Sequence, residues 1–286
     1  LKMKKAIEQS PTLPPQRGSV ACAGVFGSNA QMACDKLLPL SQIHYVTGFR
    51  AVFDAVESGE CQFGVLPIEN SSNGSVKEVY DLLEERKCYI VRGTRLRISH
   101  DLLVKKGTKL EDIHTIISHP QALGQCSHFL DKLEGVELRS YDNTARAAQL
   151  VAASDDPGVA AIAAPQCADL YNLSPLLRNI QNSDNNYTRF ICISKDFHVY
   201  PGANKISVVT TASHAPGGLG TLLTKFANIG VNLTKLESRP IVGHNFEFLF
   251  YLDLEASLAD PKVLSVLAEL HASQDKFRLL GNYPEN

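Results

Sequence analysis

Short apolar runs alternate with amphipathic stretches over residues 18–200 of the chain. The runs predict strands at Ser19–Ala23, Phe63–Pro67, Ile113–Ser118, Val136–Tyr141 and Gly158–Ala163. The stretches between them predict helices at Gln31–Leu38, Phe49–Glu57, Val76–Arg86, His119–Leu133 and Thr144–Ala153. Strands separated by helices are typical of parallel βαβ units, so this part of the sequence predicts an α/β fold.

A second pattern begins near residue 201, after the turn residues Tyr200-Pro201-Gly202. Its elements are expected at Lys205–Ala212, Gly218–Ile229, Asn232–Pro240, Phe246–Glu255, Asp260–His271 and Lys276–Tyr283. Their βαββαβ order predicts a ferredoxin-like domain, with a central hairpin closed by Val242-Gly243-His244-Asn245. We therefore expect a leader or linker over residues 1–17, where prolines interrupt any helix, one domain over 18–200 and another over 201–286.

The composition excludes several classes of protein. Lys and Arg number 28 against 30 Asp and Glu, so the net charge of −2 provides no positive field for nucleic acid or an anionic membrane. No apolar run approaches the roughly 20 residues of a membrane span, and Leu1–Ser10 lacks the apolar centre of a signal peptide. Seven cysteines without a CxxC pair indicate reduced core thiols in a cytoplasmic protein. The nine histidines have no metal-binding spacing, so we expect no metal.

Four loops of the first domain share one design, in which an apolar strand ends, small polar residues follow and a helix begins. They are Gly24–Asn29, Glu69–Ser75, Ser118–Gln121 and Asp142–Thr144. Ligands of open parallel sheets lie at the carboxyl ends of the strands, where helix N-termini favour anions. Together the loops therefore predict a site for a small polyanion that needs no lysine cluster. For any single loop, helix capping alone is the commoner explanation, and Ser75 with Glu78 and Ser118 with Gln121 each fit a capping box.

Two more features extend this polar set. Gln125 follows Gln121 by one helical turn, on the same side of the predicted helix. A long polar loop over 179–187 runs into a strand that begins Thr188-Arg189-Phe190. Alternation directs Thr188 and Phe190 to one face of that strand and Arg189 to the other. Periodicity alone supports a solvated loop with an edge strand equally well.

Taken in order, these segments closely resemble prephenate dehydratase. The matching segments are Leu66-Pro67-Ile68-Glu69-Asn70-Ser71 with Gly74-Ser75-Val76, Ser118-His119-Pro120-Gln121-Ala122 with Gln125-Cys126, Asn179-Ile180-Gln181, and Thr188-Arg189-Phe190. The later half resembles the ACT regulatory domain through His214-Ala215-Pro216-Gly217, Asn232-Leu233-Thr234 and Glu237-Ser238-Arg239-Pro240. The likeness covers residues 18–283 and is greatest to the dehydratase and ACT portion of bifunctional chorismate mutase–prephenate dehydratase. The first 17 residues are too few for a mutase domain, so we expect no mutase activity from this chain.

The resemblance implies two α/β lobes with a cleft between them, similar to periplasmic binding proteins. It also implies the decarboxylating dehydration of prephenate to phenylpyruvate, in the synthesis of phenylalanine. Loss of the hydroxyl and one carboxylate restores the aromatic ring, so neither a cofactor nor a metal is expected. By the resemblance the catalytic set is Thr188, Glu69, Asn70, Ser118 and Gln125. Further substrate contacts are expected at Ser28, Ser71, Asn143, Thr144, Arg189 and Phe190.

Three of these side chains carry specific expectations. The Thr188 hydroxyl is a poor acid, so we expect it to donate a hydrogen bond to the leaving oxygen. Glu69 is the strongly titratable residue of the loops and is the expected proton source, if burial raises its pKa. The planar fork of Arg189 suits a substrate carboxylate, but its opposite-face direction makes a structural ion pair an equal alternative.

The resemblance further implies that L-phenylalanine binds between the ACT domains of two subunits and inhibits the enzyme. A homodimer or homotetramer is therefore expected. The expected effector contacts are His214, Gly217, Gly218, Leu219, Asn232 and Leu233. Glu237, Ser238, Arg239 and Pro240 are expected to belong to the same regulatory region, although the pattern alone favours a strand end before a hairpin.

Two segments depart from the family pattern. The first loop keeps a hydroxyl at Ser28 but has Ala30 where the family usually has a serine. Gly218 and Gly220 leave fewer side-chain atoms around an effector than the family segment does. Two other functions stay open from the sequence: arogenate dehydratase, which acts on the transaminated substrate, and a non-catalytic amino-acid sensor.

Overall fold

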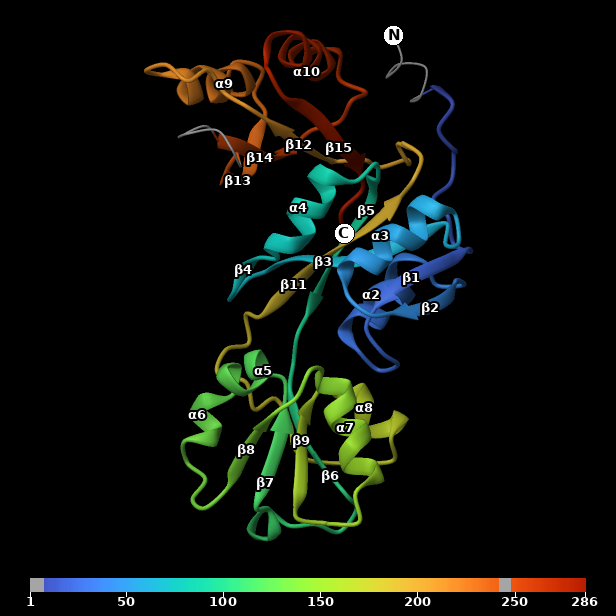
Figure 1. Cartoon of the computed structure of the whole chain (residues 1–286), viewed down its shortest axis with the longest axis vertical. Coiled ribbons are helices and arrows are strands. Elements are labelled where there is room, and N and C mark those ends of the chain that lie inside the picture. The colour runs from blue at the N-terminus through green and yellow to red at the C-terminus, as the bar shows by residue number, and fades with distance from the viewer. Residues whose placement is uncertain (1–7, 242–247) are drawn as a thin grey trace.

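The chain forms two α/β lobes and a C-terminal α/β domain that lies against the first lobe (Figure 1). The computed structural model describes residues 8–241 and 248–286. The predicted hairpin closure at 242–245 lies outside the described residues. Along the long axis the first lobe lies between the other two parts, so it contacts both.

The first lobe is built on a mixed sheet with the order β2-β1-β3-β11-β5, and β4 pairs with β3. Its strands are β1 (Ser19–Ala23), β2 (Gln42–Val46), β3 (Phe63–Asn70), β4 (Gly74–Ser75), β5 (Tyr89–Arg97) and β11 (Tyr187–Ser194). The helix α2 (Asn29–Leu37) packs on one face of the sheet, and α3 (Phe49–Ser58) and α4 (Lys77–Glu85) pack on the other. β1 is parallel to β2 and β3, whereas β11 is antiparallel to β3 and β5, so the predicted parallel sheet is only partly correct.

The second lobe has the sheet order β10-β6-β9-β7-β8. Its elements are β6 (Asp101–Val104), a 3-10 turn (Leu110–Asp112), β7 (Thr115–Ser118), α5 (Pro120–Gln125), α6 (Ser127–Leu130), β8 (Glu137–Ser140), α7 (Thr144–Ala153), β9 (Val159–Ala163), α8 (Gln166–Leu170) and β10 (Ser174–Leu177). β7 is parallel to β8 and β9, and its residues are buried throughout. The neighbouring β9 is also buried throughout, and burial on both faces explains why Val159–Ala163 is a continuous apolar run.

The helix predicted over 119–133 is broken into α5 and α6 at Cys126. The loop that returns to the first lobe is hydrogen-bonded to the chain at this break. The backbone N–H of Asn182 donates to Gln125 O at 2.6 Å, and its side-chain amide donates to Gly124 O at 3.3 Å. The Asn182 side chain also accepts from His128 N at 3.0 Å, so Asn182 takes up backbone groups that a continuing helix would pair internally. The predicted apolar face is correct, since Cys126 and Leu130 are buried in the core of this lobe.

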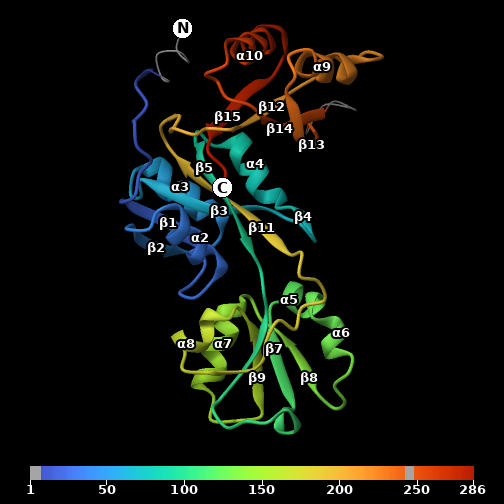
Figure 2. The ribbon, with the colours of Figure 1, turned by 180° about the vertical axis from the view of Figure 1, so that it is seen from behind.

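Two segments join the lobes: residues 98–100 lead from β5 to β6, and residues 178–186 lead from β10 to β11. They are hydrogen-bonded to each other. Ile98 N donates to Asn186 O at 2.8 Å, and Ile180 N donates to His100 O at 2.9 Å. Figure 2 shows from behind how the β5 and β11 segments lead together from the first lobe to the second. Polar residues placed on this double connection therefore lie between the lobes.

The C-terminal domain has the predicted βαββαβ order. Its elements are β12 (Lys205–Thr210), α9 (Gly218–Ala227), β13 (Asn232–Pro240), β14 (Phe248–Glu255), α10 (Pro261–Ser273) and β15 (Phe277–Tyr283). They form an antiparallel sheet with the order β13-β14-β12-β15, the arrangement of a ferredoxin-like unit. Both helices contribute buried residues to one apolar cluster with this sheet.

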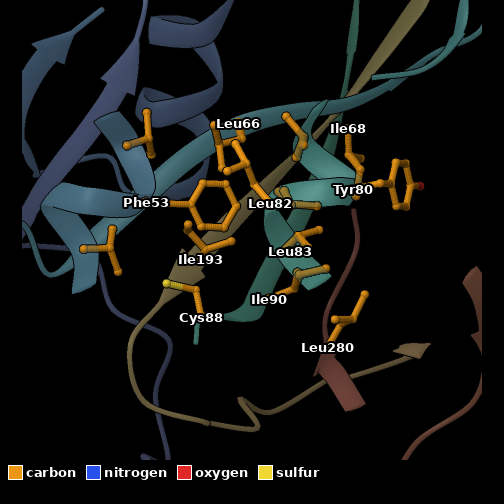
Figure 3. Close-up of a cluster of buried hydrophobic side chains, with 14 of the residues drawn as sticks. Phe53, Leu66, Ile68, Tyr80, Leu82, Leu83, Cys88, Ile90, Ile193 and Leu280 are labelled. Atoms are coloured by element: carbon orange, nitrogen blue, oxygen red, sulfur yellow. The ribbon is translucent and has the colours of Figure 1, made fainter. Parts of the chain in front are cut away.

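One apolar core joins the C-terminal domain to the first lobe (Figure 3). It contains Phe53 of α3, Leu83 of α4, Ile90 of β5 and Leu280 of β15, all at most 1% exposed. The strands β15 and β5 approach closely because residue 281 is a glycine, where an added Cβ would lie 2.1 Å from Ile90 O. All seven cysteines are buried and unpaired, as predicted for small core residues.

Candidate active site

A cleft of about 250 Å³ lies between the two lobes. It is lined by Ala23, Ser28, Asn29, Ala30, Phe49, Pro67, Asn70, Ile98, His100, His119, Gln121, Ala122, Gln125, Asp142, Asn143, Thr144, Thr188 and Phe190. The polar loops that the sequence predicted to converge supply most of the polar residues of this lining. We refer to this set of residues as the interlobe cleft.

Three helices begin at the interlobe cleft, and each has its capping residue in the lining. Ser28 Oγ accepts from Gln31 N at the start of α2, and His119 Nδ1 accepts from Gln121 N at the start of α5. Asn143 Oδ1 accepts from Ala145 N at 2.8 Å at the start of α7. Helix N-termini attract anions through their dipoles and free N–H groups. None of the described residues in the lining is a lysine or arginine, so an anion here would be held mainly by such dipoles and by neutral donors.

Thr188 and Asn70 face each other across paired strands at the wall of the cleft. They are partners in the register of β11 and β3, and Asn70 Nδ2 donates to Thr188 Oγ1 at 2.9 Å. The direction of this bond is fixed because Asn70 Oδ1 accepts from the backbone N–H groups of Ser72 at 3.0 Å and Asn73 at 3.1 Å. The Thr188 oxygen therefore acts as an acceptor toward Asn70, and its O–H is left to donate into the cleft.

The hydrogen bonds continue from Asn70 across to the second lobe. Asn70 Nδ2 also donates to Asn186 Oδ1 at 2.9 Å, and Asn186 Nδ2 donates to Gln125 Oε1 at 3.1 Å. The same Gln125 oxygen lies 2.9 Å from His100 Nε2, which must donate to it. We call Thr188, Asn70, Asn186, Gln125 and His100 the hydrogen-bond chain. Because its oxygen accepts both bonds, Gln125 presents its amide N–H groups as donors to a ligand in the cleft.

The titratable residues of the lining are His100, His119 and Asp142. Asp142 is paired with Arg146 at 2.8 Å, and the His119 ring caps α5. His100 is 3% exposed, and burial lowers its pKa, although its bond with Gln125 acts in the opposite direction. The lowered pKa favours the neutral imidazole at neutral pH, and the bond to Gln125 Oε1 places its proton on Nε2.

Arg189 and Glu69 lie on the far side of the same strands, away from the interlobe cleft. They form the next pair in the register of β11 and β3, and both line a second cavity, of about 390 Å³, toward the C-terminal domain. The Arg189 side chain is 6% exposed and lies 2.5 Å from Asp253 Oδ2, with further bonds to Glu285 and the Tyr283 hydroxyl. The expectation that Arg189 holds a substrate carboxylate is therefore corrected in favour of the structural ion pair.

Glu69 is bound to the C-terminal domain through Lys235, whose Nζ lies 2.9 Å from Glu69 Oε1. Strand alternation explains the direction, because Asn70 faces the cleft and its neighbour on β3 must face away. The expectation that Glu69 supplies the proton is therefore corrected, since the carboxylate lies outside the cleft lining. Ser71 is likewise outside the lining and bonds to the backbone of Asn185 and Tyr187.

Ser118 has a structural position. Its side chain is fully buried, and its hydroxyl donates to Ile162 O at 2.6 Å, which ties β7 to β9. The predicted capping box with Gln121 is wrong, because His119 caps α5. The capping box of Ser75 and Glu78 is also wrong: α4 has no side-chain cap, and Ser75 bonds to Lys235 and Glu237 of the C-terminal domain.

The first loop is hydrogen-bonded to α8 of the other lobe and to Tyr171, which follows that helix. The Tyr171 hydroxyl donates to Phe26 O at 2.7 Å, and Gln166 Nε2 donates to Gly27 O at 3.1 Å. Ala30 lines the cleft with its methyl group, so the departure from the family serine removes a hydroxyl from the lining itself. Ser28 lines the cleft as well, as the sequence predicted.

The C-terminal domain has its own cavity, of about 640 Å³, lined by the loop before α9. His214, Gly217, Gly218 and Leu219 belong to this lining, together with Phe248, Phe250 and others. Position 218 requires glycine because the backbone of Ser213 lies close to it: an added Cβ would lie 2.0 Å from Ser213 O. Asn232 and Leu233 are outside this lining in the single chain; Asn232 bonds to Glu255.

The four predicted regulatory residues lie at the end of β13. Glu237 bonds to the Ser75 hydroxyl of the first lobe and is 3.2 Å from Arg239. Arg239 also lies 3.9 Å from Asp81 of α4, and all four residues pair with β14. This strand end therefore contacts the first lobe.

Sequence reasoning missed His100, Asn186 and His119 as candidates for the site. His100 and Asn186 lie on the double connection between the lobes, and that connection depends on β5 and β6, which the pattern did not predict. Asn186 stands in the polar loop that the sequence did single out, so the loop was the available signal. Among the described residues, no cluster of His, Cys, Asp and Glu has the geometry to hold a metal ion.

The family model for prephenate dehydratase matches residues 20–198. The chain belongs to the prephenate dehydratase family. It is 36% identical to arogenate dehydratase/prephenate dehydratase 2 of Arabidopsis thaliana, an alignment that covers 99% of this chain and 81% of the relative.

Solved structures agree with this membership. Prephenate dehydratase from Arthrobacter aurescens, in complex with L-Phe, has a TM-score of 0.84 at 30% identity over 93% of this chain and 89% of its own. GqqA, described as a novel type of quorum quenching acylase, has a TM-score of 0.83 at 29% identity over 94% of this chain and 98% of its own. The dehydratase family therefore accounts for the fold, with both lobes and the C-terminal domain included in these alignments. Within the part of the chain that the structure describes, no helix is long and apolar enough to span a membrane.

Proposed function

We propose that this chain catalyses the decarboxylating dehydration of prephenate to phenylpyruvate. The observation that carries the proposal is the hydrogen-bond chain, which leaves the Thr188 hydroxyl and the Gln125 amide as donors in a cleft without lysine or arginine. Prephenate carries two carboxylates and one hydroxyl. A cleft of helix N-termini and neutral donors suits a dianion that must lose an oxygen.

The residues divide the chemistry as follows. The carboxylates lie at the N-termini of α2 and α7, near Ser28 and Asn143. The ring carbon–carboxylate bond breaks, carbon dioxide leaves, and the electron pair moves into the ring while the carbon–oxygen bond to the hydroxyl breaks. Thr188 donates a hydrogen bond to the departing oxygen as its negative charge develops. Asn70 holds Thr188 in that orientation, so the donor needs little reorganisation during the reaction.

The C-terminal domain is proposed to act as an ACT-type regulatory domain that binds L-phenylalanine. Its antiparallel βαββαβ sheet and the cavity at His214, Gly217 and Leu219 support this assignment. The solved relative from Arthrobacter aurescens was obtained in complex with L-Phe. Asn232 and Leu233 lie outside the cavity of one chain, so we propose that a second subunit brings them to the effector in a homodimer or homotetramer.

Arogenate is the second candidate substrate. The curated relative from Arabidopsis thaliana carries both activities in its name. In this chain the Asp142 carboxylate lines the interlobe cleft and is a suitable partner for the ammonium group that arogenate has and prephenate lacks. Its pairing with Arg146 offsets this charge, and we therefore place prephenate first.

The test is product formation by the purified chain with no cofactor added. Phenylpyruvate from prephenate and phenylalanine from arogenate are measured in parallel, and the ratio of kcat/KM assigns the preferred substrate. We expect turnover of prephenate at the higher kcat/KM, with inhibition by added L-phenylalanine. Phenylalanine binding without turnover of either substrate would contradict the proposal and support the amino-acid sensor.

A further inference from the structure

The proposed reaction needs a proton, because the hydroxyl must leave as water. With Glu69 on the far side of β3, the described residues of the cleft offer three titratable groups. His119 uses Nδ1 as an acceptor for the N-terminus of α5, and Asp142 is paired with Arg146. His100 is the third, and it differs from the other two in having a buried ring nitrogen, Nδ1, without a hydrogen-bond partner among the described residues.

His100 is held firmly at the connection between the lobes. Its backbone N–H donates to Gln181 Oε1 at 2.9 Å, and its carbonyl accepts from Ile180 N at 2.9 Å. Its Nε2 is committed to Gln125 at 2.9 Å. Its Nδ1 is buried and has no hydrogen-bond partner among the described residues. An unpaired buried polar atom costs free energy, and its presence in a ligand cleft indicates a partner that arrives with the ligand.

We propose that His100 is the general acid of this enzyme and protonates the leaving hydroxyl through Nδ1. The assignment rests on the proposed dehydratase function and names the proton source for it. The neutral imidazole takes a proton from solvent when the dianionic substrate binds, because nearby negative charge favours the imidazolium. As the carbon–oxygen bond breaks, its electron pair stays on oxygen, the Nδ1 proton joins that oxygen, and water leaves while His100 returns to neutral.

The charges around His100 are compatible with this cycle. Asp101, the next residue, favours the protonated ring, and its Oδ1 accepts from Asn179 N at 2.9 Å. Its other oxygen lies 3.8 Å from Arg178, which is largely exposed. Asp142 and His119 are the other titratable groups of the same cleft. In the protonated ring, Nε2 still donates to Gln125, so protonation of Nδ1 leaves the hydrogen-bond chain intact.

The test is the pH dependence of kcat for the wild type, His100→Gln and His119→Gln. Glutamine at position 100 is able to donate to Gln125 from its amide but holds no titratable proton, so it separates acid catalysis from positioning. We expect the wild-type kcat to fall as pH rises through the pKa of His100 in the complex. In His100→Gln we expect kcat to be lower by about 10²-fold or more and to lack this fall at high pH, with little change in KM. In His119→Gln, kcat should still fall as the pH rises.

Several outcomes overturn the assignment. A wild-type kcat that is flat between pH 5 and 9 does so without any variant, which covers the case in which His100→Gln fails to fold. A folded His100→Gln that keeps the wild-type kcat and its fall at high pH also overturns it. So does a loss of this fall in His119→Gln in place of His100→Gln. If the wild type turns over neither prephenate nor arogenate, the proposed function itself fails, and this result is distinct from an active wild type with an equally active His100→Gln.

Discussion

Thr188 and Arg189 are consecutive residues of β11, yet Thr188 lines the interlobe cleft and Arg189 is bonded to the C-terminal domain. The paired strand β3 repeats the arrangement, with Asn70 toward the cleft and Glu69 toward that domain. Two neighbouring pairs of one ladder thus belong to two different sites. A displacement of the C-terminal domain against β11 would move Thr188 and Asn70 with it.

Arg189→Gln is expected to destabilise the protein by about 3–5 kcal/mol, because it leaves the buried Asp253 carboxylate without a cation and removes one of the cations paired with Glu285. KM should change little, since Arg189 does not line the cleft. Urea unfolding and steady-state kinetics measure the two effects. A large rise in KM at unchanged stability would contradict this and indicate that Arg189 binds the substrate.

Glu69→Gln is expected to keep a kcat close to that of the wild type, and to lower the free energy of unfolding by about 1 kcal/mol, because the Glu69 side chain is 35% exposed and Lys235 keeps Glu237 as a partner. A variant of the neighbouring residue, Asn70, provides the matched comparison of kcat. Asn70→Ala should lower kcat strongly, because it removes the bond that orients Thr188. If Glu69 were the acid, its substitution would cost about 10²–10⁴-fold in kcat.

Ser118→Ala is expected to act on stability and not on chemistry. Its hydroxyl satisfies the buried carbonyl of Ile162, and leaving that carbonyl unpaired costs about 1–3 kcal/mol. Ser58→Ala is the control, since the Ser58 hydroxyl bonds to Ala55 O at 3.2 Å in a less buried place. A large loss of kcat in stable Ser118→Ala would show that the serine takes part in the reaction.

Stability should fall as the pH is lowered, in two separate windows. Burial lowers the pKa of His100, so the unfolded chain binds its proton first and stability is lost below about pH 6.5. Burial opposes ionisation of Glu285, but Arg189 and Lys205 lower its pKa overall, so its contribution is lost only below about pH 4.3. Urea unfolding at pH 7 and 5 measures the first window. His100→Gln should have a smaller stability difference between the two pH values, and an unchanged difference would contradict this account.

The sequence pattern predicted the fold where the signal is local. The strand at Ser19–Ala23 and the helix at Thr144–Ala153 agree with the structure residue for residue, since each follows one period without interruption. β5 and β6 were missed because Arg92, Arg95 and Arg97 interrupt the apolar run and because β6 has only four residues. The crossing between the lobes depends on these two strands, so the connection itself was not predictable from periodicity.

The candidate site was predicted in part, and strand alternation explains the division. Asn70, Gln125, Thr188 and Phe190 meet in the cleft, as expected from motifs at the ends of strands. Alternation correctly separated Arg189 from Thr188, but it was not applied to Glu69 and Asn70, where it separates the pair in the same way. His100 carries no periodic signal, because its place is set by long-range pairing with the segment around Ile180.

The central claim is that the Thr188 hydroxyl, oriented by Asn70, stabilises the departing oxygen. The most direct measurement is the rate of phenylpyruvate formation from prephenate by Thr188→Val and Thr188→Ser. Valine keeps the shape and removes the donor, so kcat should fall about 10²–10³-fold with little change in KM or in the unfolding midpoint. Serine keeps the donor and should retain most of the activity. Wild-type kcat in Thr188→Val would contradict the account.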